Sequence, residues 1–164
     1  MKKVMIVMGS DSDLNVMQGS VKQLQSFGVP FEVRIASAHR TPKLAEELAS
    51  GAIDNNFGVI IAAAGKAAHL GGVLAAQTTL PVIAVPIKSS TLDGLDSLLS
   101  MVQMPKGIPV ACMAIDGADN AALFAVQVLA LSEPVLAQKL VEYKEDMARK
   151  VMEKDAAVCK EYNA

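Results

Sequence analysis

The spacing of apolar runs is the feature that most constrains the fold of this chain. Five short apolar runs recur about every 25 residues, and a segment with helical periodicity follows each one. The runs are residues 3–8, 31–36, 58–64, 82–87 and 109–115, and the helical segments are 14–27, 42–53, 68–78, 92–104 and 120–131. Strands that alternate with helices predict an α/β fold, with a parallel sheet covered on both faces.

The second run differs from the other four in its pattern. The first, third, fourth and fifth runs are almost continuously apolar, as strands buried on both faces must be. The second, FEVRIA, alternates Phe31, Val33 and Ile35 with charged residues, which is typical of an edge strand. An edge position for this strand favours a flavodoxin-like, three-layer αβα sandwich with strand order 2-1-3-4-5. The apolar fifth strand then lies at the other edge and needs a cover.

The last segment, residues 133–162, is predicted to form one long amphipathic helix. Its apolar residues recur at intervals of three, four or seven, at Leu136, Leu140, Tyr143, Met147, Val151 and Val158. Thirty helical residues span ~45 Å, about the diameter of the whole domain. This helix is therefore a candidate cover for the fifth strand, and we expect it to overhang and to pack on a neighbouring subunit. A frayed, solvated tail is the alternative. We take residues 1–164 as a single domain.

Composition and charge exclude several classes of function. Apolar residues make up 52% of the chain, enough for a large buried core, and the formal net charge is −2 with no basic run. This balance argues against a nucleic-acid-binding or membrane-surface protein. No apolar stretch reaches the ~18 residues of a membrane span. Cys112 and Cys159 suggest reduced thiols in a cytoplasmic protein, and two histidines with two scattered cysteines give no metal-ligand spacing.

Candidate binding residues follow the first three strands. In this strand order, ligands bind beyond the carboxyl ends of the strands, between the first and the third. The loops gathered there read GSDSD (9–13), SAHRTP (37–42) and AGKAAHLGG (64–72). The only two histidines of the chain, His39 and His69, fall in two of these loops. We therefore expect both histidines on one rim of the sheet.

The first loop is suited to a phosphate. Gly9 permits a tight turn, and the amides and hydroxyls of Ser10 and Ser12 at a helix start offer donors to an anion. Asp13 would repel a phosphate but accept hydrogen bonds from ribose hydroxyls. Simple helix capping is the alternative for all of these residues.

The second and third loops carry the candidate acid–base group. An imidazole such as that of His39 can act as acid or base near neutral pH, and Arg40 offers a planar fork to phosphate or carboxylate. Glycine and alanine at 65–67 allow the backbone to approach a ligand closely. His69 either orients a ligand or caps the next helix. The residues alone thus indicate an α/β domain that binds a small phosphorylated metabolite.

Five motifs together carry a resemblance to a known family. They are VMGSDSD, SAHRTP, AAHL, DSLLSMVQMPKGIPVA (96–111) and NAALFAVQVLAL (120–131). Over nearly its whole length the chain resembles the bacterial N5-carboxyaminoimidazole ribonucleotide mutases of de novo purine biosynthesis. The resemblance implies a carboxylate shift from an exocyclic nitrogen to ring carbon C4, without ATP, metal or organic cofactor. It also implies a homo-octamer in which the carboxyl-terminal helix packs on neighbouring subunits.

The resemblance also assigns roles to residues. It implies that Ser10 and Arg40 bind phosphate, that Asp13 binds ribose, and that His39 is the catalytic acid–base. His69 and the Gly65–Leu70 loop would line the carboxylate pocket. The other substrate-binding candidates in these loops are Gly9, Ser12, Ser37, Ala38, Gly65, Ala67 and Leu70. Two alternatives remain open: the animal-type branch, which carboxylates aminoimidazole ribonucleotide directly with carbon dioxide, and a non-catalytic nucleotide-binding oligomer.

Three residues depart from the pattern of that family. Its third loop usually reads AGGAAHLPG, so Lys66 replaces a small residue and Gly71 replaces a proline. Lys66 would either perturb the carboxylate pocket or point to solvent, and Gly71 is expected to loosen the start of its helix. Asp116 stands where glycine is common, in a segment that is shorter than usual.

Overall fold

The computed structural model describes residues 1–90 and 92–163, which fold into five strands and six α-helices. The strands are β1 (Lys3–Met8), β2 (Phe31–Ile35), β3 (Phe57–Gly65), β4 (Val82–Ile87) and β5 (Ala111–Cys112). The α-helices are α1 (Leu14–Phe27), α2 (Pro42–Ser50), α3 (Leu70–Ala75), α4 (Leu95–Val102), α5 (Ala118–Ala130) and α6 (Pro134–Tyr162). A 3₁₀ helix, η1 (Asp11–Asp13), precedes α1, and a left-handed turn, η2 (Leu92–Gly94), precedes α4.

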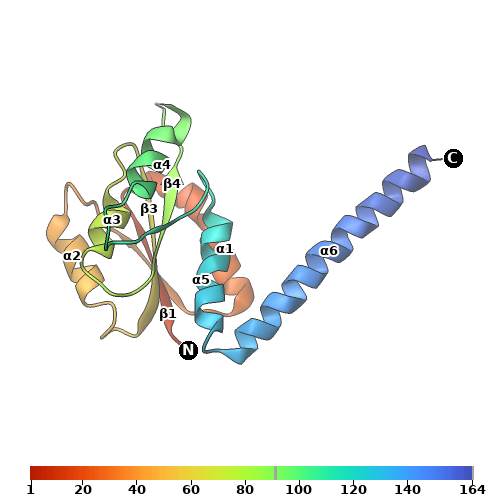
Figure 1. Ribbon diagram of the computed structural model, residues 1–164, viewed down its shortest axis with the longest axis horizontal. Helices are drawn as coiled ribbons and strands as arrows, with labels where there is room; N and C mark the ends of the chain where they lie inside the picture. The colour runs from red at the N-terminus through yellow and green to blue at the C-terminus, as the bar shows by residue number, and fades with distance from the viewer. Residues whose placement is uncertain (91, 164) are drawn as a thin grey trace.

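The sheet has the predicted topology. All its strand pairs are parallel, and their order is β2-β1-β3-β4-β5. Ile6 of β1 pairs with Val33 of β2 on one side and with Ile61 of β3 on the other. Figure 1 shows α1 and α5 on one face of the sheet and α2, α3 and α4 on the other. The flavodoxin-like three-layer sandwich is therefore confirmed.

The apolar runs of the central strands supply two separate cores. Alternate residues of a strand point to opposite faces of the sheet. Ile6 and Ile61 pack toward α1 and α5, whereas Val7 and Ile60 pack toward α2 and α3, and all four are fully buried. This two-sided burial explains why these strands read as continuous apolar runs instead of alternating ones.

The two edge strands differ from expectation in detail. β2 does lie at an edge, but Val33 and Ile35 are 37% and 51% exposed, so this strand has no well-buried face within the protomer. β5 is only two residues long, not the predicted 109–115, and pairs only with Ile83 and Ala84. Proline has no N–H for a ladder. Pro86 lies in β4 and Pro109 lies two residues before β5, which limits the pairing between these strands.

Three helices are shorter than their patterns predict, although α1 has the predicted bounds. α2 ends at Ser50, three residues before the predicted end of its segment at residue 53. α3 holds six residues, and its first turn contains Gly71 and Gly72, which are poor helix formers. α4 begins at Leu95 because the three residues before it have φ between 50° and 93°, outside the helical region.

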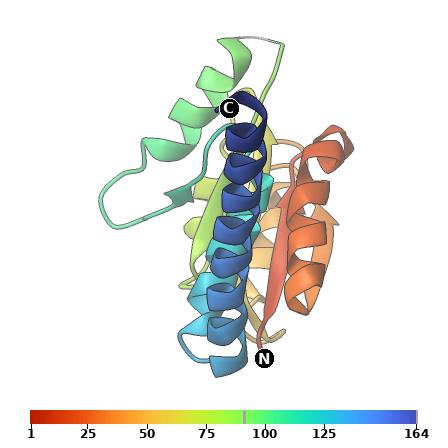
Figure 2. The same ribbon diagram turned by 90° about the vertical axis from the view of Figure 1, so that its right-hand side faces the viewer.

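Helix α6 does not cover β5, contrary to one expectation. Its first turns pack against α1 and α5. Leu136 is fully buried, and the ring centroids of Tyr143 and Phe27 are 5.6 Å apart. The Lys139 ammonium donates a hydrogen bond to the Phe27 carbonyl at 2.7 Å. This docking aims the rest of the helix away from the body (Figures 1 and 2).

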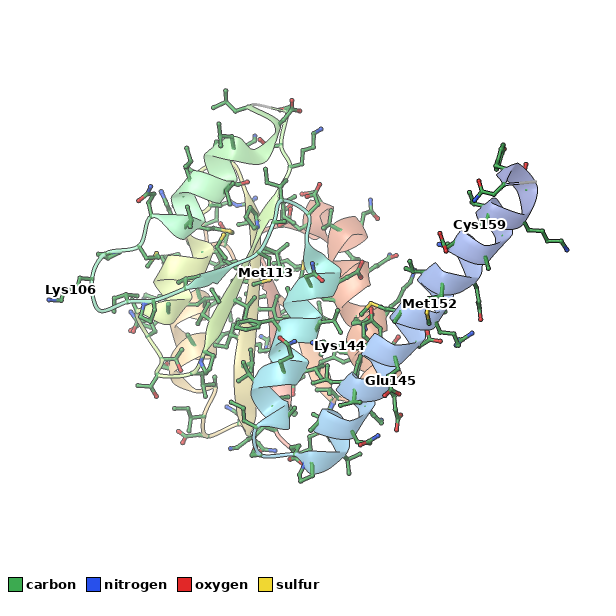
Figure 3. All side chains as sticks on the ribbon, turned by 45° about the vertical axis from the view of Figure 1, so that its right-hand side comes forward. Lys106, Met113, Lys144, Glu145, Met152 and Cys159 are labelled. Atoms are coloured by element: carbon green, nitrogen blue, oxygen red, sulfur yellow. The ribbon has the colours of Figure 1, made fainter. Side chains whose placement is uncertain are left out.

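The second half of α6 keeps its apolar stripe but has no partner within the described part of the protomer. Met147, Val151 and Val158 are 43%, 65% and 55% exposed. Figure 3 shows the part of this half that carries Met152 and Cys159 projecting beyond the other elements. Over the described residues, no helix combines the length and apolar character needed to cross a membrane.

Candidate active site

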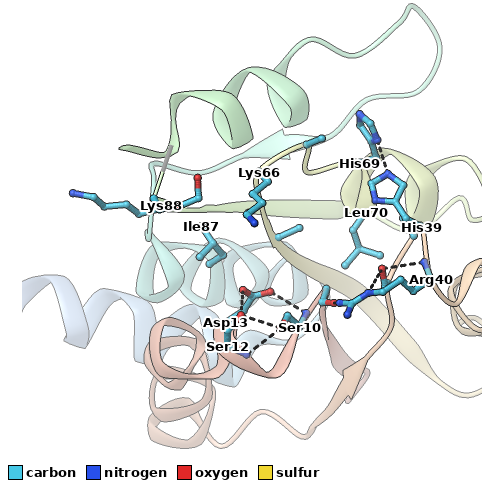
Figure 4. A pocket seen from close by; sticks show the side chains of 18 residues that line it. Ser10, Ser12, Asp13, His39, Arg40, Lys66, His69, Leu70, Ile87 and Lys88 are labelled. Carbon is cyan, nitrogen blue, oxygen red and sulfur yellow. Dashed lines mark hydrogen bonds between the residues drawn. The ribbon is translucent and has the colours of Figure 1, made fainter. Parts of the chain in front are cut away.

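A pocket of about 730 Å³ opens at the carboxyl ends of the strands (Figure 4). Its walls come from the loops that follow β1, β2, β3 and β4. Every residue predicted for the site lies in this lining: Gly9, Ser10, Ser12, Asp13, Ser37, Ala38, His39, Arg40, Gly65, Ala67, His69 and Leu70. The topology thus brings the three predicted loops together around one cavity.

The loop after β1 is a capping box that also faces the pocket. The Ser12 amide donates to Ser10 Oγ at 3.3 Å, and the Ser10 amide donates to Asp13 Oδ2 at 3.1 Å. The Ser12 hydroxyl donates to Ser10 Oγ at 2.9 Å. These bonds hold the loop in shape before any ligand arrives, so capping and ligand binding are compatible functions of the same residues.

The Asp13 carboxylate is buried at the base of this loop. Its residue is only 5% exposed, and this burial raises the pKa of Asp13, although the hydrogen bond from the Ser10 amide partly offsets the effect. The ionised form is therefore destabilised relative to solvent.

This shift predicts a pH-dependent effect of Asp13→Asn. A carboxyl whose pKa is raised on folding stabilises the fold fully below its unfolded pKa of 3.8, and that contribution is lost as pH rises through the folded pKa. Asn is always neutral and keeps an acceptor for the Ser10 amide. We expect the free energy of unfolding of the variant, relative to that of wild type, to be larger at pH 7 than at pH 4. Urea denaturation of both proteins at the two pH values measures this difference. A difference that is independent of pH would contradict this.

Arg40 links the second loop to the first. Its Nη2 donates to the Gly9 carbonyl at 3.2 Å, and its backbone amide donates to Ser37 Oγ at 3.2 Å. The Ser37 amide in turn donates to Thr41 Oγ1 at 2.9 Å, directly before Pro42 opens α2 as predicted. The guanidinium is exposed on the pocket wall and keeps further N–H donors for an anion.

The two histidines are in direct contact. His39 Nε2 lies 2.8 Å from His69 Nδ1, and the rings meet edge to face at 84°. A hydrogen bond between them requires a hydrogen on one of these nitrogens and a lone pair on the other. The two imidazoles therefore carry at most one positive charge together while this hydrogen bond is present. His69 makes no side-chain cap to α3, which disfavours the capping alternative for this residue.

The loop after β4 also lines the pocket, and sequence reasoning missed it. It contributes Lys88, Ser89 and Ser90, next to Ile87 at the end of β4. The Lys88 amide donates to Asp116 Oδ1 at 2.9 Å, and its ammonium pairs with Asp93 at 3.2 Å. The sequence does contain a pattern that could have identified this loop. In the predicted strand order β4 adjoins β3, so the polar residues KSS that follow the apolar run of β4 reach the same rim.

The three departures from the family pattern each have a defined geometry. Lys66 and Asp116 adopt left-handed backbone, with φ of 58° and 57°, a conformation that favours glycine. Gly71 is buried in the first turn of α3, where a Cβ would come 3.3 Å from the Cβ of Ala84. Gly71 therefore allows α3 to approach β4 closely.

The fold and the pocket define a flavodoxin-like α/β protein with a small-molecule site at its topological switch point. The model of the AIR carboxylase family matches residues 3–150. A protein named N5-carboxyaminoimidazole ribonucleotide mutase from Pyrococcus horikoshii is 58% identical over 91% of this chain and 84% of its own length. Its namesake from Thermotoga maritima is 53% identical over 94% of this chain and 90% of its own length. The chain belongs to the AIR carboxylase family.

Other relatives extend the comparison. The chloroplastic phosphoribosylaminoimidazole carboxylase of Vigna aconitifolia is 53% identical over 89% of this chain, which matches 26% of that longer protein. The crystal structure of Treponema denticola PurE superposes with a TM-score of 0.85 at 30% identity, over 94% of this chain and 96% of that one. This superposition agrees with the observed fold.

Proposed function

We propose that this protein interconverts N5-carboxyaminoimidazole ribonucleotide and 4-carboxy-5-aminoimidazole ribonucleotide in de novo purine biosynthesis. The curated relatives that match most of its length carry the name of this mutase. The observation that carries the proposal within the chain is the contact of His39 with His69 at 2.8 Å, beside a pocket with phosphate-binding chemistry.

The substrate would span the three loops. Ser10 and Arg40 bind the phosphate. Arg40 keeps N–H donors beside its bond to the Gly9 carbonyl, whereas the Ser10 hydroxyl donates to the Asp11 carboxylate at 3.1 Å in this structure and would turn to the ligand. Asp13 accepts a hydrogen bond from the ribose. Gly65, Ala67 and Leu70 lie beside His69 in the lining and enclose the migrating carboxylate.

The reaction needs one proton delivered and one removed. The bond between the exocyclic nitrogen and the carboxylate carbon breaks, that nitrogen gains a proton, and carbon dioxide is released into the pocket. Ring carbon C4, an enamine-like nucleophile, then forms a bond to carbon dioxide and loses its hydrogen as a proton. His39 donates the first proton and accepts the second, so it returns to its starting state.

Retention of carbon dioxide in the pocket would favour the second step of this reaction. Holding carbon dioxide next to C4 replaces a bimolecular encounter with an effectively intramolecular one. The small residues Gly65 and Ala67 leave room for carbon dioxide against the backbone, and the His39–His69 hydrogen bond fixes the orientation of the acid–base ring.

A carboxylase that takes up carbon dioxide from solution is the second candidate. The relative from Vigna aconitifolia is named a carboxylase, which supports this reaction as the alternative. Both reactions form the same C4 carboxylate and differ in the source of its carbon. To test for the mutase, the purified protein is given N5-carboxyaminoimidazole ribonucleotide without ATP or added bicarbonate. Formation of the C4-carboxylated product, followed by chromatography, is expected; its absence would refute the assignment.

The protein would act as a homo-oligomer, with an octamer as the expected state. The exposed stripe of Met147, Val151 and Val158 supports this part of the proposal, because an apolar stripe of this length on a projecting helix favours burial against another surface.

This part of the proposal predicts that Val151→Asp weakens assembly. The substitution places a charge in the apolar stripe, and we expect smaller species in sedimentation velocity. Lys160→Asp is the control, because Lys160 is exposed and lies on the opposite side of α6, nine residues further on. An unchanged sedimentation profile for Val151→Asp would exclude this half of the helix as a contact.

A further inference from the structure

Lys66 is a cation on the pocket wall that the proposed mechanism does not use. It lies in the lining between Gly65 and Ala67, and its residue is exposed. Figure 4 shows its ammonium on the pocket side of the loop, directed toward the side where Ser10 and Asp13 lie. The side chain therefore reaches into the volume that a ligand would fill.

The ammonium of Lys66 has no ion pair within the described part of the chain. The other lysine of the lining, Lys88, is paired with Asp93 at 3.2 Å, and Arg40 already donates to the Gly9 carbonyl. No carboxylate of the described residues lies within 4 Å of Lys66 Nζ. Its charge is thus available to an incoming anion.

The backbone at Lys66 gives an independent reason to expect a role for the side chain. Its φ of 58° lies in the left-handed region, where a residue with a Cβ is strained and glycine is not. Lysine at this position is thus kept at a cost in folding stability. Strained residues of this kind cluster at ligand-binding sites.

The geometry points to Lys66 as a substrate-binding residue of this chain, one whose ammonium contacts an anionic group of the nucleotide. This inference rests on the proposed function, because that substrate carries two such groups, the 5′-phosphate and the migrating carboxylate. A contact between an ammonium and either group is a charge-assisted hydrogen bond. Lys66 would add to Arg40 a second cation that reaches the ligand from the opposite loop.

The test compares two stable nucleotides by calorimetric titration. The 4-carboxy-5-aminoimidazole ribonucleotide carries both anions, whereas 5-aminoimidazole-4-carboxamide ribonucleotide carries the phosphate and a neutral amide. Lys66→Gln removes the charge and keeps a side chain at the strained position. We expect it to weaken binding about tenfold, the scale of one hydrogen bond to a charged group. Lys106→Gln, in a loop outside the pocket lining, is the control for net charge.

The pattern of losses identifies the group. Weaker binding of both nucleotides would assign Lys66 to the phosphate, and weaker binding of the carboxylated one alone would assign it to the carboxylate. Lys66→Arg should retain most of the affinity, and Lys66→Gly should raise the thermal midpoint while it weakens binding. Unchanged affinity of Lys66→Gln for both nucleotides would overturn the inference. If the wild type bound neither nucleotide, the proposed function itself would fail instead.

Discussion

Replacing His39 with asparagine is expected to lower the turnover number by roughly 10²- to 10⁴-fold, the contribution typical of a positioned acid–base group. Asparagine can occupy the same space and can still hydrogen-bond to His69, but it cannot exchange a proton near neutral pH. Because Ser10 and Arg40 remain in place, substrate affinity should stay within a few-fold of wild type. Steady-state kinetics and calorimetric titration measure the two quantities separately.

His69→Asn supplies the matched comparison. His69 touches the same ring at 2.8 Å, but its role in the proposal is to orient His39 and line the pocket, so the loss in turnover should be smaller. Full activity of His39→Asn would contradict the assignment of His39 and revive the non-catalytic binding module.

Leu136→Ala should lower the free energy of unfolding by about 2–5 kcal/mol, the range for truncating a fully buried leucine. Leu136 is the one residue of α6 that is fully buried among those described, and it packs in the core shared with α1 and α5. Its removal leaves a cavity where α6 docks. Urea denaturation at a fixed protein concentration measures the loss.

Val151→Ala is the control within the same helix. Val151 is 65% exposed, so its truncation should change the unfolding of the protomer by less than about 0.5 kcal/mol. Any larger effect should depend on protein concentration, because it would arise from assembly. Similar losses for Leu136→Ala and Val151→Ala, independent of concentration, would mean that the whole stripe packs within one protomer.

The central part of the fold was predictable because its signals are local. β1, β3 and β4 are continuous apolar runs, and the strand order followed from the single alternating run at the second strand. The length of β5 was not predictable from its apolar run, because Pro109 before this strand and Pro86 in its neighbour β4 limit the ladder. The direction of α6 depends on the docking of Leu136 and Tyr143, which involves residues more than 100 positions away.

The site was predictable at the level of loops but not of contacts. Topology alone places the ends of β1, β2 and β3 on one rim, so the twelve candidate residues could be named from the sequence. The hydrogen bond between His39 and His69 joins residues 30 positions apart, and no sequence pattern encodes that distance. The orientation of Lys66 was also open, since its loop permits either a pocket-facing or a solvent-facing side chain.

The most direct test of the central claim follows the carbon of the migrating carboxylate. The protein is mixed with N5-carboxyaminoimidazole ribonucleotide that carries carbon-13 in its carbamate, in unlabelled bicarbonate, and the C4 carboxylate of the product is analysed by mass spectrometry. The mutase proposal predicts that most product retains the label, because carbon dioxide stays in the pocket between the two steps. Product that forms with the label washed out would contradict it and would assign the protein as a carboxylase.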